Sequence, residues 1–180
     1  MRLLAEDTMG MVVDFQERLM PAISGHEEMI QRSVILIQGL KTLGIPLLMT
    51  QQYTKGIGKT VPEILEAMGS EEYFDKVEFS CFDNTAIHDK IGSLGRKNVI
   101  LCGAEAHVCL LQTCIDLKEA GYTPVLVADC VGSRKESDKQ FGLIRAQQEG
   151  VLITTSEAVL FEMTRKAGTP TFKQISKLVK

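Results

Sequence analysis

The sequence predicts a three-layer α/β/α protein with a mostly parallel central sheet of about six strands. Two observations support this fold class. Short apolar runs alternate along the chain with segments whose apolar residues recur at helical spacing. The connections between them are short, as expected for right-handed crossovers between parallel strands. Because 180 residues with 44% apolar side chains suffice for one full core, we expect residues 1–180 to form a single domain.

The first elements follow this alternation. Residues 9–13 form an apolar run typical of a buried strand. Ser24 opens an S-x-x-E capping box, and apolar residues at helical spacing follow it. A second strand over 45–49 then leads into a polar, glycine-containing loop over 50–59. The length of this loop predicts a segment that covers a site.

The middle of the chain is less regular. Thr60 begins a second capping box, which predicts a short helix. Apolar and polar side chains alternate over residues 73–79, and this alternation predicts a short extended segment. Asp83 or Asn84 then has the chemistry to cap the next helix, which ends near Gly95.

The second half returns to a clear alternation of strands and helices. We expect strands over 98–102, 124–128 and 151–153, a helix that opens at Cys109 and ends at Gly121, helices opened by capping boxes at Ser133 and Thr154, and a terminal helix with Phe172, Ile175 and Leu178.

Composition excludes several classes of partner. The net charge is −3 and no Lys/Arg-rich run occurs, so we expect no nucleic-acid partner. No apolar run approaches the roughly 20 residues that span a bilayer, and no secretory leader is recognisable, so we expect a cytoplasmic protein with no membrane partner. The five cysteines are then free thiols, and none of them forms a C-x-x-C zinc pair. A small-molecule substrate fits this composition best.

Cys109 is the strongest candidate for chemistry. It follows an apolar strand and a turn that begins at Gly103, and a helical pattern comes directly after it. In an open α/β sheet the carboxyl end of a strand faces the ligand crevice. A cysteine at a helix start lies among unpaired amide donors that favour its thiolate. We therefore predict that Cys109 is a nucleophile.

Two further residues have the chemistry to assist a thiol. Asp14 ends the first strand, and Lys76 lies in the extended piece of the middle segment. Taken singly, each has a simpler explanation, since an aspartate after a strand is often a turn residue and a lysine among acids is often a surface charge. Packing alone would also explain a cysteine. Only their combination predicts a site.

The three motifs occur in the order found in the isochorismatase-like cysteine hydrolase superfamily, which the chain resembles over nearly its whole length. Asp14 matches the general base of that family, Lys76 its lysine, and Cys109, six residues after Gly103, its nucleophile. The subgroup of isochorismatase domain-containing proteins, whose substrate is generally unassigned, is the most similar. The motifs that carry this likeness are Gln51-Gln52-Tyr53 with Gly58, Glu105 to Cys109, Ser133-Arg134 and Thr154 to Glu157.

The resemblance implies a Rossmann-like fold and a hydrolase with an Asp-Lys-Cys catalytic triad. It would act as an amidase, or on a related small carbonyl compound, through a covalent Cys109 intermediate, with Asp14 as base and Lys76 as charge stabiliser. The backbone amides of Glu105 and Cys109 would form the oxyanion hole. The resemblance also implies a cis peptide bond between Ala104 and Glu105 and a homo-oligomer, as a dimer, tetramer or larger ring.

Two departures from the family narrow the chemistry. Nicotinamidase-type members carry an Asp-x-His metal set where this chain reads Thr50-Gln51-Gln52-Tyr53-Thr54, so we expect no metal and no cofactor. Isochorismatases, which cleave a vinyl ether, tend to lack the cysteine. The alternatives are an isochorismatase-type ether hydrolase, a non-catalytic binding module on the same fold, and redox chemistry at the thiol.

Five residues are candidates for the substrate pocket: Gln16, Gln52, Tyr53, Ala104 and His107. Ordinary loop polarity explains the two glutamines and the tyrosine equally well. His107 lies two residues before the predicted nucleophile, and helix residues two apart do not face each other. We therefore expect His107 at the rim of the pocket or in a structural role.

Overall fold

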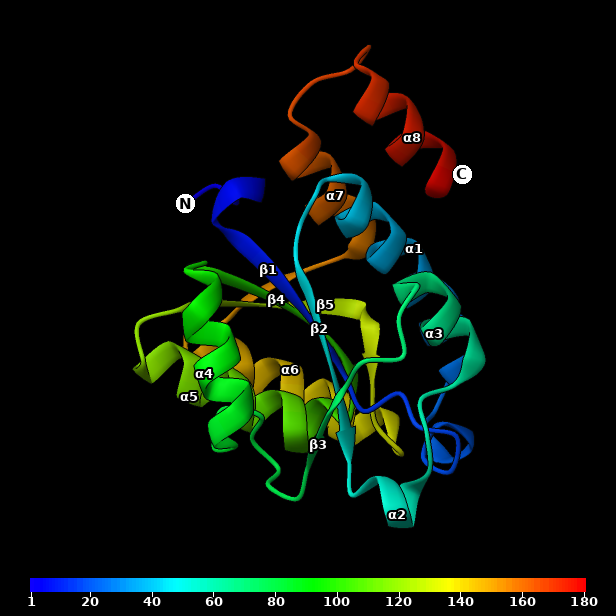
Figure 1. The fold of residues 1–180 in the computed structure, drawn as a ribbon, viewed down its shortest axis with the longest axis vertical. Helices are drawn as coiled ribbons and strands as arrows, with labels where there is room; N and C mark the ends of the chain where they lie inside the picture. Colours follow the sequence, from blue (N-terminus) through cyan, green and yellow to red (C-terminus); the bar gives the residue numbers. More distant parts are fainter.

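Six parallel strands form the central sheet of the computed structural model, which describes residues 1–180 (Figure 1). The strand order is β3-β2-β1-β4-β5-β6, so β1 and β4 are central. The bounds are β1 Thr8–Val13, β2 Leu47–Gln52, β3 Phe74–Lys76, β4 Asn98–Ala104, β5 Thr123–Gly132 and β6 Leu152–Thr154. The predicted fold class is confirmed, and every strand pair is parallel.

Helices cover both faces of the sheet. Their bounds are α1 His26–Thr42, α2 Thr54–Ile57, α3 Pro62–Met68, α4 Thr85–Leu94, α5 Leu111–Glu119, α6 Glu136–Gln148, α7 Ser156–Thr164 and α8 Pro170–Leu178, with short 3₁₀ turns at Ala5–Asp7 and Met20–Ala22. Helices α1, α3, α7 and α8 pack on one face, and α4, α5 and α6 pack on the other. None of these helices combines the length and the apolar character that crossing a bilayer requires.

The core is divided by the sheet into two apolar clusters. Successive side chains of a strand point to opposite faces, so Val12 joins the cluster under α1 while Met11 and Val13 join the cluster under α5. Every residue of β1 and β4 is buried, as expected for central parallel strands that are covered on both faces. The strands β1 and β4 therefore form the centre of the sheet and are covered by helices on both faces.

The second strand begins and ends later than predicted. The apolar run over 45–49 suggested a strand there, but β2 continues through Gln51 and Gln52. These two polar residues pair with β3, Gln51 opposite Asp75 and Gln52 opposite Lys76. Backbone pairing with an edge strand, which apolar periodicity does not reveal, therefore extends the sheet.

The four predicted capping boxes do not form. No side chain caps α1, α3, α6 or α7, whose N-cap residues are Gly25, Val61, Lys135 and Thr155. Each helix thus starts after the residue expected to cap it. The expected cap at Asn84 does form, because its side-chain oxygen accepts the Ile87 N–H at 3.3 Å.

Gly103 allows the end of β4 to lie against β1. Its φ is +131°, and a Cβ at this position would stand 1.9 Å from the backbone oxygen of Val13. Only glycine avoids that collision. The turn that follows β4 is therefore held directly beside the residue that follows β1, which is Asp14.

Candidate active site

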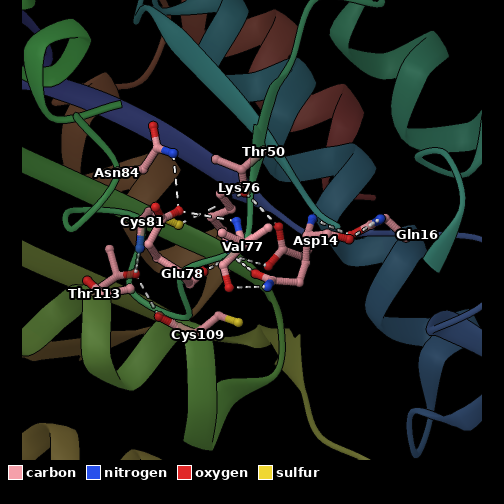
Figure 2. Close-up of polar contacts among 12 residues, drawn as sticks. Asp14, Gln16, Thr50, Lys76, Val77, Glu78, Cys81, Asn84, Cys109 and Thr113 are labelled. Carbon is pink, nitrogen blue, oxygen red and sulfur yellow. Dashed lines mark hydrogen bonds and ion pairs between the residues drawn. The ribbon is translucent and has the colours of Figure 1, made fainter. Parts of the chain in front are cut away.

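The candidate site lies at the carboxyl ends of four adjacent strands. Asp14 follows β1, Gln52 ends β2, Lys76 ends β3, and Cys109 lies in the turn after β4. Because the strand order places β3, β2, β1 and β4 next to one another, these residues meet although Asp14 and Lys76 are 62 positions apart in the sequence. Figure 2 shows the resulting cluster.

Asp14 and Lys76 form a buried ion pair. Lys76 Nζ lies 2.8 Å from Asp14 Oδ2, and the two residues are 2% and 1% exposed. The other carboxylate oxygen, Oδ1, accepts the hydroxyl of Thr50 at 2.8 Å. Lys76 Nζ also donates to Gln52 Oε1 at 2.5 Å and to the backbone oxygen of Glu78 at 3.3 Å. Each charge is thus held by several bonds, as burial requires.

These contacts keep Lys76 charged. Burial by itself lowers the pKa of an ammonium group, but the nearby Asp14, Cys81 and Cys109 and the hydrogen bond to Asp14 raise it, and the net pKa of Lys76 lies above 10.5. Lys76 therefore carries a full positive charge at neutral pH and is not poised to exchange a proton. Its role in the site is electrostatic.

Cys109 differs from expectation in its local structure. It does not open an α-helix but lies in a π-helical turn over Ala106–Leu110, which α5 continues. Its side chain extends toward the Asp14 side of the cluster (Figure 2) and is 7% exposed. A single π turn of this kind is frequent at functional sites.

The protonation state of Cys109 also differs from expectation. Burial first, and then the negative charge of Asp14, raise the pKa of the Cys109 thiol to about 12, because Lys76 offsets only part of their effect. The thiolate that a helix start would favour is therefore not the resting form. At neutral pH the site holds a neutral thiol beside an ionised Asp14–Lys76 pair.

Thr113 connects the nucleophile turn to the loop after β3. Its hydroxyl donates to the backbone oxygen of Cys109 at 2.6 Å and accepts the backbone N–H of Cys81 at 2.8 Å. One helical turn further along α5, Asp116 accepts the hydroxyl of Ser80. The loop that follows Lys76 is thus fastened to the helix that follows Cys109.

Sequence reasoning missed Thr50, Cys81 and Thr113. One signal was available for Thr113, because a threonine four residues after another helix residue commonly bonds that residue's carbonyl. Thr50 and Cys81 had no such signal, since both reach the site through neighbouring strands and a loop. Burial raises the pKa of Cys81 to about 11, and Lys76 opposes the effect.

Glu105 lies between the strand end and the nucleophile turn. The peptide bond between Ala104 and Glu105 is cis, as the family resemblance implied. The Glu105 carboxylate accepts the backbone N–H of Arg134 at 3.1 Å and its Nε at 3.0 Å. The backbone N–H of Glu105 donates to no acceptor in the chain, so it is available to a ligand.

Gln16 has a different setting from the pocket lining that was expected. Its side chain is fully buried. Its amide nitrogen donates to the backbone oxygens of Gln52 at 2.9 Å and Gly58 at 2.7 Å, and its oxygen accepts the Gln52 N–H at 2.7 Å. Gln16 therefore ties the end of β1 to the loop after β2. Ala104 is fully buried as well and presents no surface to a ligand.

The other pocket candidates lie nearer the surface. Tyr53 is 52% exposed and donates its backbone N–H to Lys76 O at 2.8 Å. Val77 and Phe79, which sequence reasoning did not select, are also exposed, and they follow Lys76 in the chain. His107 bonds Ser133 Oγ through Nδ1 at 2.9 Å.

The stretch over 50–54 serves as a hydrogen-bonding segment. Gln51 Nε2 donates to Thr60 Oγ1 at 2.9 Å, and Gln51 Oε1 accepts the Thr54 hydroxyl at 2.9 Å. Gln52 Nε2 donates to the backbone oxygen of Val77 at 2.9 Å. No group of three or more His, Cys, Asp or Glu side chains is placed to hold a metal ion.

Comparison with known proteins identifies relatives along the whole chain. Residues 8–158 match the isochorismatase domain. Isochorismatase domain-containing protein 2 of Danio rerio is 37% identical over 179 residues, which are 99% of this chain and 89% of that protein. The structure of the MAR1 ribonuclease from Caenorhabditis elegans has a TM-score of 0.93 at 37% identity and covers 99% of this chain and 92% of that chain. The YcaC gene product of Escherichia coli, described as an octameric hydrolase of unknown specificity, shares the fold with a TM-score of 0.91 at 21% identity over 98% of this chain and 90% of its own.

Proposed function

The chain belongs to the isochorismatase family, and from this premise we propose that it hydrolyses a small amide or related carbonyl compound through a covalent intermediate on Cys109. One observation carries the proposal: the buried Asp14–Lys76 ion pair, at 2.8 Å, lies beside a thiol. A thiol adds to a carbonyl carbon, whereas adding water to a protonated vinyl ether needs no nucleophilic side chain. This chemistry therefore favours an amidase over an ether hydrolase.

In the first step, Asp14 accepts the thiol proton as Cys109 Sγ attacks the carbonyl carbon. The raised pKa of Cys109, which is due first to burial and then to Asp14, means that a free thiolate is scarce at neutral pH. Proton transfer thus accompanies formation of the carbon–sulfur bond. The negative charge passes from Asp14 to the carbonyl oxygen as the carbon–sulfur bond forms, while Lys76 stays protonated throughout and stabilises the Asp14 carboxylate each time it is restored.

The carbonyl oxygen becomes an oxyanion when the carbon–sulfur bond forms. We assign its stabilisation to the backbone N–H groups of Glu105 and Cys109, and the unpaired state of the Glu105 N–H supports this assignment. Collapse of the intermediate breaks the carbon–nitrogen bond, and Asp14 returns its proton to the leaving amine. A thioester on Cys109 results.

Water completes the cycle. Asp14, again a carboxylate, accepts a proton from the water molecule that attacks the thioester carbon. The carbon–sulfur bond breaks, the carboxylic acid product leaves, and the proton held by Asp14 returns to Cys109. The complete reaction consumes one water molecule for each amide bond and needs no cofactor.

Phosphodiester cleavage is a second activity to test, because the C. elegans relative is named a ribonuclease. The chain has a net charge of −3, and a protein that binds RNA along its backbone usually presents a basic surface. This charge supports the amide proposal over RNA cleavage. An RNA oligonucleotide belongs in the same panel of compounds.

The test incubates the purified protein with a panel of small amides, a vinyl ether and an RNA oligonucleotide and measures ammonia, acid and fragment release. We expect ammonia from at least one amide and an acyl adduct on the Cys109 peptide by mass spectrometry. Cys109→Ala and Asp14→Asn should abolish turnover with the circular dichroism spectrum retained, while Cys114→Ala, a matched buried thiol, should keep it. Turnover that survives Cys109→Ala would refute the covalent step, and RNA cleavage without amide turnover would replace the proposal.

We also propose that the chain assembles as a homo-oligomer of two or more copies. Support comes from the fold shared with an octameric hydrolase from E. coli and from exposed apolar side chains on helices and loops.

A further inference from the structure

The outer face of α6 carries an exposed apolar pair. Phe141 is 70% exposed and Ile144 is 51% exposed, which places Phe141 second only to the terminal Met1 among large hydrophobic side chains. Residues three apart share one face of a helix. Ser137 and Gln148, both exposed, extend the same stripe by one turn at each end. The stripe is thus apolar at its centre, polar at its ends and free of charge.

The opposite face of α6 is fixed to the molecule. Gly142 and Ala146 are buried, and a Cβ at Gly142 would stand 3.0 Å from His107 Cα. Helix α6 therefore packs closely on the π turn that carries Cys109, with no freedom to turn its apolar stripe inward. The stripe therefore stays open to a partner from outside the chain.

We propose that a second copy of this chain covers the stripe, with its own α6 antiparallel to the first across a two-fold axis. The pattern of the stripe is symmetric about its centre, near Gly142. In the antiparallel pairing, Phe141 meets the partner's Ile144, Ile144 meets the partner's Phe141, and Ser137 meets the partner's Gln148. A two-fold interface requires such self-complementarity, because the same surface is used twice.

The charges beside the stripe fit the same arrangement. At 100° per residue, Asp138 and Arg145 lie on one flank of the stripe, and their side chains are 41% and 57% exposed. An antiparallel pairing brings each Asp138 close to the partner's Arg145, so two opposite-charge contacts form. Parallel helices related by a two-fold axis would instead set this charged flank against the partner's Gln140 and the partner's Gln147, and neither opposite-charge contact would form. Arg145 already binds Glu149 through Nε at 2.5 Å, and its terminal amino groups donate to no group of the chain.

The second flank of the stripe is neutral apart from Glu136 in the first turn of α6. Gln140 and Gln147, both exposed, lie there and would face each other across the axis. Nothing on this flank opposes the pairing. The inference takes the proposed homo-oligomer further by naming its face, and it is independent of the hydrolytic chemistry.

The test uses two surface variants that cannot pair with themselves. Phe141→Asp places a carboxylate against the partner's Ile144, and Ile144→Lys places an ammonium against the partner's Phe141. Size-exclusion chromatography with light scattering should give the native chain a mass that is a multiple of 19.9 kDa. Each variant alone should have at most half the mass of the native oligomer. An equimolar mixture should recover association, because Asp at 141 then meets Lys at 144 while the native Phe–Ile contact forms once.

Tyr73→Asp is the matched control. Tyr73 is also an exposed hydrophobic residue, at 42%, but it precedes β3 at the far edge of the sheet, and its variant should keep the native mass. Circular dichroism verifies that every variant is folded. A native chain that is monomeric overturns both this face and the homo-oligomer. A native oligomer that tolerates both variants overturns the face alone, and variants that dissociate but do not combine overturn the antiparallel pairing.

Discussion

Asp14→Asn removes one charge from the buried ion pair and leaves the shape of the side chain unchanged. Lys76, at 2% exposure, then keeps its charge without a counter-ion. At the 2.8 Å separation of Nζ and Oδ2, an effective dielectric constant of 20 gives an attraction of about 6 kcal/mol. Part of this offsets the desolvation of both ions, so we expect the free energy of unfolding to fall by about 3–5 kcal/mol.

A double-mutant cycle isolates the charge pairing from other effects of substitution. Lys76→Met should also cost about 3–5 kcal/mol, because it leaves the Asp14 carboxylate buried without its cation. The double variant contains no unpaired buried charge. Its loss should therefore be smaller than the sum of the two single losses by about 2 kcal/mol.

Urea unfolding followed by far-UV circular dichroism measures all three variants, since the chain contains no tryptophan for fluorescence. Thr50→Val is the control, because it removes the 2.8 Å hydrogen bond to Asp14 and leaves both charges in place. It should cost about 1 kcal/mol. Losses that add to within about 0.5 kcal/mol in the double variant would refute the reasoning, since the residues would then not be coupled as an ion pair.

Three further predictions concern the thiols and the turn. Burial raises the pKa of Cys102 from 9.0 to about 12, so its stabilising contribution is complete below pH 9 and declines as pH rises toward 12; the free energy of unfolding should fall by about 1.4 kcal/mol per pH unit for this thiol, and Cys102→Ala should reduce the slope. Thr113→Val should cost about 1–3 kcal/mol in urea unfolding, because the Cys109 carbonyl loses its hydroxyl donor, and Thr113→Ser should retain most of the stability. Gly103→Ala should cost more than about 4 kcal/mol or prevent folding, as judged by soluble yield and circular dichroism, since its Cβ would stand 1.9 Å from the Val13 oxygen.

Each of these predictions has a contrary outcome. Gly44→Ala is the matched control for Gly103, because its φ is +71° and no atom lies within 4 Å of the added Cβ; it should cost about 1–2 kcal/mol, and equal losses at both glycines would contradict the steric argument. A pH slope between 9 and 11 that Cys102→Ala leaves unchanged would show that this thiol ionises normally. Equal losses for Thr113→Val and Thr113→Ser would assign the effect to packing instead of the hydroxyl.

Local sequence patterns predicted the strands and helices whose burial repeats regularly along the chain. The apolar run of β1 and the helical spacing of α1 follow directly from burial on a sheet covered on both sides. The capping boxes failed because a cap depends on where the backbone turns, and the packing of each helix moved that point by one or more residues. At Ser133, for example, the hydroxyl bonds His107 and not a helix end.

The sequence alone determined which chemical groups are present: a thiol after β4, an acid after β1 and a lysine in β3, in the order shared with the family. Only the tertiary structure decided which of these groups carry a charge. The strand order places Asp14 and Lys76 at 2.8 Å and removes both from water. The same burial raises the pKa of Cys109, whereas a helix start by itself favours the thiolate. Ionisation depends on solvent and on charges brought from distant parts of the chain, which is why spacing along the sequence could not reveal it.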